Sequence, residues 1–130
     1  MIKNNNYFVL KYWKSFALTI IIIILCALPG DEIDEAKFIN IPYLDKIVHL
    51  GMYFSLSIIL MLESIKTSVK RIKTIIILVF IYCFTLGVSI EILQKYIFIN
   101  RGADIIDVIF NVTGIIFGIF LYLKIKKLKS

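Results

Sequence analysis

The sequence predicts an all-α membrane protein, a polytopic bundle of four transmembrane helices with both termini in the cytoplasm. Three observations predict it. Of the 130 residues, 60% are hydrophobic and only 18% are charged. The charges leave four uncharged stretches, and the connections between them are alternately acidic and basic. A soluble domain of this length could not bury so much apolar surface, because small globules leave a large fraction of their chain exposed.

The four uncharged runs are 15–30, 47–62, 74–90 and 108–123, each of 16 or 17 residues. A spanning helix needs about 20 residues, and each run reaches that length when the polar residues at its ends enter the interface. Lipid offers no partner to an open backbone, so runs of this length without alternation are expected to be helices. We therefore expect one domain, 1–130, with helices near 11–29, 45–63, 72–97 and 104–124.

The basic residues predict how the bundle is oriented. Eleven of the fifteen lie before the first run, in the second connection or after the last run: Lys3, Lys11, Lys14, Lys66, Lys70, Arg71, Lys73, Lys124, Lys126, Lys127 and Lys129. Eight of the nine acidic residues fall on the other side of the bilayer, and only Glu63 does not. The positive-inside rule then gives a multi-pass cell-membrane protein with cytoplasmic termini. The net charge of +6 follows from this bias, so we expect the lipid bilayer as a partner and no nucleic acid.

Polar residues share faces in the outer halves of the last three helices. With about 100° per residue, the polar and small residues of the fourth helix fall within roughly 80°, and those of the third within about 60°. The residues are Asp104, Asp107, Asn111, Gly114 and Gly118 on the fourth helix, Gly87, Glu91 and Gln94 on the third, and Asp45 and His49 on the second, with Arg101 in the adjoining loop. This geometry predicts one polar pocket that opens to the outer leaflet.

These residues also form an ordered motif. It consists of Asp45-Lys46-x-x-His49, then Glu91-x-x-Gln94, then Arg101, and finally Asp107-x-x-x-Asn111-x-x-Gly114-x-x-x-Gly118. The set with its spacings resembles the VanZ-like membrane proteins over about residues 7–124. The family takes its name from an accessory factor in teicoplanin resistance. The resemblance implies a small multi-span protein of the cell envelope, with a link to antibiotic resistance and with motif residues that face outward, but it implies no mechanism.

The predicted pocket suits an anionic envelope lipid or a lipid-linked cell-wall intermediate. Asp45 would orient His49 as a base, Glu91 would serve as an acid, and Arg101 would hold a phosphate. As candidate catalytic residues we take His49, Glu91 and Asp107; as substrate-binding residues Asp45, Gln94, Arg101 and Asn111; and as helix-packing residues Gly87, Gly114 and Gly118. The sequence leaves open whether such a site turns a lipid over or only binds it.

A non-catalytic alternative uses the same residues. Asp45 and Asp104 would cap their helices, and Gln94 and Asn111 would form interhelical hydrogen bonds. Arg101, Asp107 and Glu91 would form a buried ion network, so that the polar groups only hold the helices together or shelter a ligand. No cofactor is expected. By ligand type, however, His49 with Asp45, Glu91 and Asp107 would suit a divalent metal, which stays open as an alternative.

Overall fold

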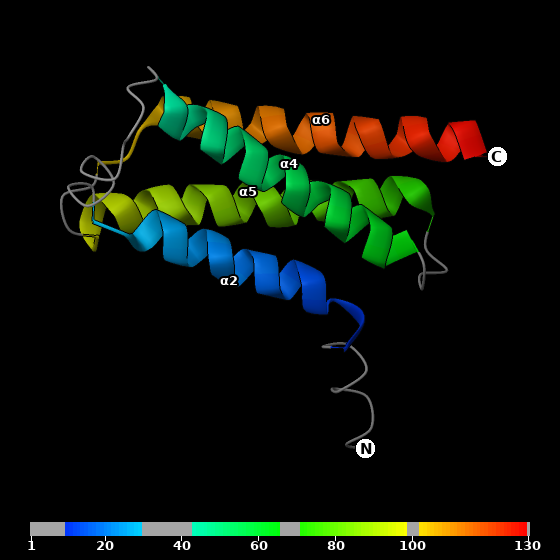
Figure 1. Cartoon of the computed structure of the whole chain (residues 1–130), viewed down its shortest axis with the longest axis horizontal. Helices are drawn as coiled ribbons and strands as arrows, with labels where there is room; N and C mark the ends of the chain where they lie inside the picture. The colour runs from blue at the N-terminus through cyan, green and yellow to red at the C-terminus, as the bar shows by residue number, and fades with distance from the viewer. Residues whose placement is uncertain (1–9, 30–42, 66–70, 99–101, 130) are drawn as a thin grey trace.

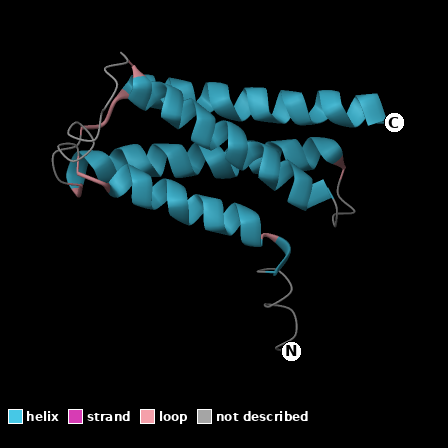
Figure 2. Ribbon diagram, viewed as in Figure 1, coloured by secondary structure: helices cyan, strands magenta, loops and turns pink. Residues whose placement is uncertain are grey.

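The computed structural model describes residues 10–29, 43–65, 71–98 and 102–129. Over this part of the chain it has four long helices and no strand (Figure 2). The helices are α2 (Trp13–Ala27), α4 (Leu44–Ile65), α5 (Ile72–Tyr96) and α6 (Ile105–Lys129). The predicted all-α fold is confirmed.

Three of these helices are long and apolar enough to cross a bilayer. The helices α4, α5 and α6 have 22, 25 and 25 residues. At 1.5 Å per residue they are about 33–38 Å long, against a hydrocarbon core of about 30 Å. The helix α2 has 15 residues and reaches only about 22 Å. The chain is therefore a helical protein with several candidate spans, whereas the fourth crossing stays a prediction.

Most helix ends lie within two residues of the predicted ones, and the end of α6 is the exception. This helix continues through Lys124, Lys126 and Lys127 as far as Lys129, beyond the predicted end at 124. The prediction followed the apolar stretch, which marks the membrane span. Lysine is a good helix former, so the helix can continue past the hydrocarbon.

The four helices run in alternating directions, which gives the bundle two different ends (Figure 1). We call the end where α2 and α5 finish and α4 and α6 begin the acidic end, and the opposite one the basic end. The helix α4 runs diagonally through the bundle (Figure 1), packing most extensively on α6 and also contacting α5 and α2. This crossing makes α4 the helix that links the other three.

Apolar side chains fill the core and also cover the outside. Tyr53, Leu56, Met61, Cys83 and Ile115 are fully buried between the helices. Large apolar side chains remain exposed along α2, α5 and α6, among them Ile21, Ile24, Ile77, Ile81, Ile116, Phe117 and Phe120. An apolar exterior of this extent is unfavourable in water and favourable in lipid. The bilayer is therefore the environment in which this surface is stable.

Two glycines of α6 let its backbone touch that of α4. A Cβ atom on Gly114 would overlap the carbonyl oxygen of Leu50 and lie 3.0 Å from the amide nitrogen of Phe54. One on Gly118 would overlap the hydroxyl of Ser57 and lie 2.6 Å from the carbonyl oxygen of Phe54. This is the close approach for which membrane helices use small residues four apart. It also fixes how the polar beginnings of α4 and α6 face each other.

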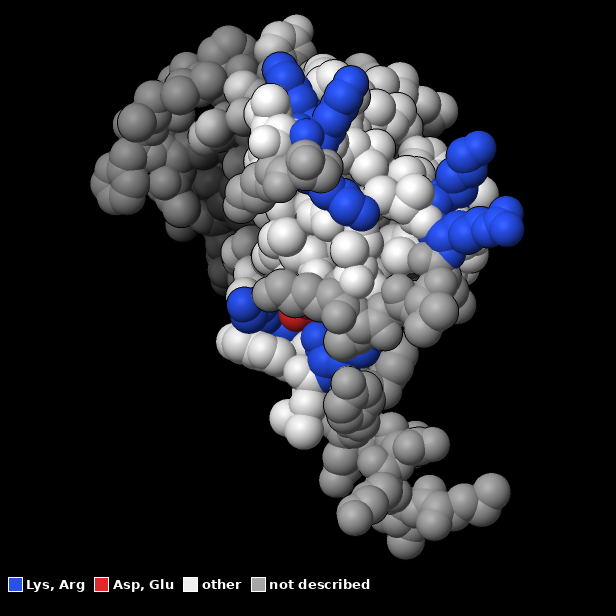
Figure 3. All heavy atoms as spheres, turned by 90° about the vertical axis from the view of Figure 1, so that its right-hand side faces the viewer, with Lys and Arg blue, Asp and Glu red and all other residues white. Residues whose placement is uncertain are grey.

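The basic end gathers lysine and arginine side chains around the helix ends (Figure 3). They come from the beginnings of α2 and α5 and from the last turns of α6: Lys11, Lys14, Arg71, Lys73, Lys124, Lys126 and Lys127. Glu63, near the end of α4, accepts hydrogen bonds from the amides of Lys14 and Ser15 at 3.2 Å each. This carboxylate caps the beginning of α2, where free N–H groups and the helix dipole favour a negative charge.

Candidate functional site

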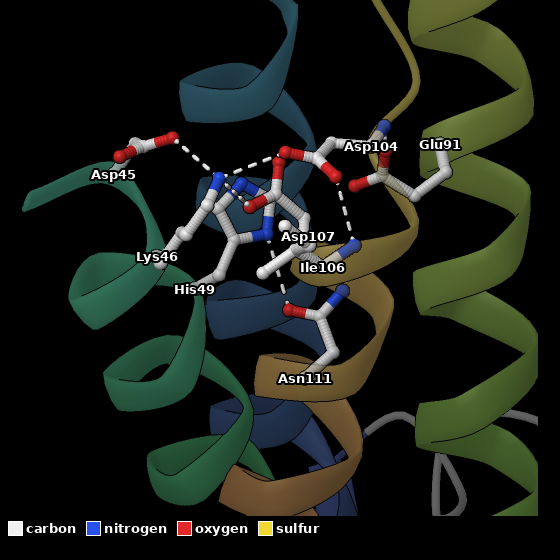
Figure 4. Close-up of polar contacts among 8 residues, drawn as sticks. All are labelled: Asp45, Lys46, His49, Glu91, Asp104, Ile106, Asp107 and Asn111. Carbon is white, nitrogen blue, oxygen red and sulfur yellow. Dashed lines mark hydrogen bonds and ion pairs between the residues drawn. The ribbon is translucent and has the colours of Figure 1, made fainter. Parts of the chain in front are cut away.

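A group of polar side chains lies at the acidic end, where α4, α5 and α6 meet (Figure 4). We call it the polar cluster, and it consists of Asp45, Lys46, His49, Glu91, Asp104, Asp107 and Asn111. Five of its members, Lys46, His49, Glu91, Asp107 and Asn111, are at most 9% exposed. Ionisable groups so well shielded in a membrane bundle are costly and usually have a function.

Lys46 is the centre of the cluster. Its Nζ donates hydrogen bonds to Asp104 Oδ2 at 2.9 Å, Asp107 Oδ1 at 3.1 Å and Asp45 Oδ2 at 3.2 Å. An ammonium group has three donors, and the three carboxylates use all of them. The hydrogen bond from Lys46 holds the pKa of Asp104 below its usual value, because it favours the charged carboxylate.

Lys46 belongs to the ordered motif of the sequence, but it was not among the predicted site residues. A signal was nevertheless present. Lys46 precedes His49 by three residues, so the two side chains share a helix face. It also stands directly next to Asp45 at the start of an apolar run, where a lysine that does not reach the interface needs an acidic partner.

His49 pairs with Asn111 across the interface between α4 and α6. The distance from His49 Nδ1 to Asn111 Oδ1 is 3.1 Å, and both residues are buried. An amide oxygen only accepts, so Nδ1 carries the proton, and in the neutral imidazole Nε2 then holds the lone pair. The expectation that Asp45 orients His49 is not met, since Asp45 bonds the adjacent ammonium group of Lys46 instead. A carboxylate pairs more strongly with an ammonium group than with a neutral imidazole.

Glu91 connects α5 with the beginning of α6. Its Oε2 accepts the backbone N–H of Asp104 at 3.0 Å, while Oε1 is buried and has no hydrogen-bond partner among the residues that the structure describes. Asp104 in turn caps α6, since its Oδ1 accepts the N–H of Ile106 at 2.8 Å. Glu91 is therefore held by the loop that leads into α6, with one oxygen free to accept.

In the described ranges, two further buried side-chain atoms have no hydrogen-bond partner: Asn111 Nδ2 and the hydroxyl of Tyr53. Both lie beside Gly87, where a Cβ atom would be 3.2 Å from the amide nitrogen and 3.4 Å from the hydroxyl. Tyr53 was not among the predicted site residues. It lies one turn beyond His49, and a tyrosine so deep in an apolar helix was indistinguishable from a core aromatic.

The three residues expected to be catalytic lie together. One ligand atom each of His49, Glu91 and Asp107 lies within 4.8 Å of the other two. Two carboxylates and an imidazole are a donor set that suits a divalent transition metal. Asp45, the fourth ligand considered from the sequence, is not part of this group and is bonded to Lys46.

The two remaining residues predicted to bind a substrate are Gln94 and Arg101. Gln94 is buried, and its Nε2 donates to the carbonyl oxygen of Cys26 at 3.2 Å, which ties α5 to the last turn of α2. This interhelical bond corresponds to the non-catalytic role considered for Gln94. Arg101, the predicted phosphate ligand, lies outside the described residues.

Fold and site together define a class of protein: a small helical bundle for the membrane, with a charged cluster buried at one end of three long apolar helices. Comparison with protein families makes the class specific. The VanZ/LLP1 family matches residues 6–127, nearly the whole chain, and the chain belongs to this family. No curated protein and no solved structure gives a significant match.

Proposed function

We propose that the polar cluster binds or acts on the phosphate-bearing headgroup of an anionic envelope lipid or a lipid-linked cell-wall intermediate. The observation that carries this proposal is the buried cluster of charged groups at the end of an apolar bundle, which contains the Lys46 ammonium group and, among the described residues, the unpartnered Oε1 of Glu91. Lipid headgroups lie at this depth of a bilayer, with acyl chains along the helices. The cluster thus places ionisable groups and a free acceptor where a headgroup would be.

The chemistry of the cluster fits two forms of this function. In an enzyme, His49 would accept a proton at Nε2, and Glu91 would give or take one at Oε1. In a binding protein, the same groups would only hold the headgroup. The described cluster has four carboxylates and one ammonium group, so a phosphate needs further positive charge. The sequence assigns that role to Arg101.

A headgroup site would also connect the chain with teicoplanin resistance. A lipid-bearing glycopeptide acts among the outer-leaflet lipids, so a protein that alters or sequesters one of them would change susceptibility. A structural role is the second candidate, and the Lys46 network favours it, because all three ammonium donors are used within the chain and join α4 to the beginning of α6.

The lipid content of cells and of the purified protein tests the proposal. We expect cells that express the chain to gain or lose an anionic lipid species if it is an enzyme, or the protein to retain such a lipid on purification if it is a binder. His49→Ala and Glu91→Gln should abolish either effect at unchanged abundance. Glu63→Gln alters the carboxylate at the opposite end and should preserve it. An unchanged lipid profile together with lipid-free purified protein would contradict the lipid proposal and favour the structural role.

The proposal requires the acidic end to face outward. The basic residues at the opposite end predict cytoplasmic termini, because positively charged segments are retained in the cytoplasm. A reporter that is active only in the cytoplasm should therefore be active when fused after Ser130, and one that is active only outside should be silent there. The reverse pair of results would place the polar cluster on the cytoplasmic side and exclude an outer-leaflet substrate.

A further inference from the structure

One carboxylate oxygen in the polar cluster lacks the partner that its burial demands. Glu91 is 4% exposed, and its Oε1 has no hydrogen-bond donor within the described part of the chain, whereas Oε2 has the amide of Asp104. A buried acceptor without a donor is costly, and more so when it is charged. The side chain points toward Asp104 and Asp107 (Figure 4). A group that satisfies this oxygen has to sit within the cluster.

His49 is arranged as metal-binding histidines usually are. Its Nδ1 is engaged by Asn111 Oδ1, which fixes the tautomer and leaves the lone pair on Nε2. In Figure 4 this second nitrogen lies on the side of the ring that faces the Asp107 carboxylate and Lys46. Asn111 therefore holds the ring with its second nitrogen on the side of the Asp107 carboxylate.

The spacing and the charge both favour a cation. The three ligand atoms lie within 4.8 Å of one another, and a tetrahedral ion with bonds of about 2.0–2.1 Å would hold them about 3.3 Å apart. Small side-chain shifts would close that difference. Of the two carboxylate oxygens of Asp107, Oδ1 accepts the hydrogen bond from Lys46, so Oδ2 is left to bind an ion. Among the cluster residues that the structure describes, one ammonium group faces four carboxylates, and a divalent ion would offset much of this excess.

We propose that His49, Glu91 and Asp107 form a site for a divalent transition metal such as Zn²⁺ or Mn²⁺. Asn111 is a positioning residue that acts through His49. Three protein ligands leave coordination positions open, as in catalytic rather than structural sites. Asp45 and Asp104 are 49% and 40% exposed at the edge of the cluster, which gives an ion a polar route to the site. The metal site shares His49 and Glu91 with the lipid proposal, and a bound ion would make these two groups ligands instead of a base and an acid. Metal binding itself needs no lipid, because the chain's own side chains supply the ligands.

Metal binding can be measured without any lipid substrate. The full-length protein, purified in detergent and stripped with a chelator, is titrated with Zn²⁺ and separately with Mn²⁺. Calorimetry gives affinity, and elemental analysis of the re-purified protein gives stoichiometry. We expect roughly one ion per chain for the wild type. His49→Ala and Glu91→Gln should lose binding, and Asn111→Ala should weaken it by about 10- to 100-fold. Glu63→Gln, a carboxylate at the basic end, should bind as the wild type does.

Two outcomes overturn the site: a stripped wild type that takes up no stoichiometric ion, or His49→Ala and Glu91→Gln variants that bind as tightly as the wild type. If either variant fails to fold, X-ray absorption of the Zn²⁺-loaded wild type decides. We expect one imidazole nitrogen with oxygen neighbours. Sulfur from Cys26 or Cys83 in the coordination shell would contradict the assignment. Because no lipid is present, failure here leaves the lipid proposal untouched.

Discussion

Lys46→Met is expected to destabilise the bundle by about 3 kcal/mol, since removing one partner of a buried ion pair leaves its carboxylates uncompensated. Most of this loss in stability should come from the Asp107 carboxylate left without its cation, because the Asp107 side chain is only 12% exposed. Asp45 and Asp104 are partly exposed, so water can solvate their carboxylates once the ammonium group is removed. The expected loss of stability is therefore at the lower end of the range for breaking a buried ion pair. The measurement is the free energy of unfolding in mixed micelles titrated with dodecyl sulfate, followed by circular dichroism.

Lys95→Met is the matched control, because Lys95 is an exposed lysine at the same end of the bundle, where its ammonium group lies over the ring of Tyr96. This variant should change stability by less than about 1 kcal/mol. Adding Asp107→Asn to Lys46→Met should recover part of the loss, because it removes the buried charge that was left alone. If Lys46→Met proves as stable as Lys95→Met, another cation must balance the acids of the cluster.

Gly114→Ala is expected to break the contact between α4 and α6. The added methyl group would overlap the carbonyl oxygen of Leu50, which is backbone and cannot rotate away. The two helices would have to separate, so we expect a loss of about 3 kcal/mol, the upper part of the range for overpacked cores. Unfolding in mixed micelles measures the loss. Metal binding should also fall, because His49 on α4 and Asp107 on α6 no longer meet at the same distance.

Gly51→Ala is the corresponding control on the facing helix. A Cβ atom at Gly51 would meet nothing within 4 Å, so the methyl group is accommodated without any shift. Alanine is the better helix former, and the variant should be neutral or more stable by up to about 1 kcal/mol. Equal destabilisation by both alanines would mean that general helix flexibility, rather than the close approach at Gly114, sets the stability of this pair.

The sequence was informative about the site where helix periodicity applies. Asp107 and Asn111 lie one turn apart on α6, and the regular helix places both on the face that meets α4. It was uninformative about pairing between helices. His49 could bond Asp45 on its own helix or Asn111 on another, and only the crossing of α4 and α6 decides for Asn111. Gln94 likewise shares a face with Glu91, yet the position of α2 provides Cys26 as its partner.

The order of the apolar runs, the alternation of charge and the ordered motif were enough to predict an all-helical membrane bundle of this family, because lipid restricts a spanning chain to few structures. Periodicity also placed the acidic and amide side chains at one end. The tertiary structure alone decided that Lys46 is the hub of the cluster and that Oε1 of Glu91 is left without a donor. Such pairings depend on distances between helices, which a pattern along a single helix does not contain.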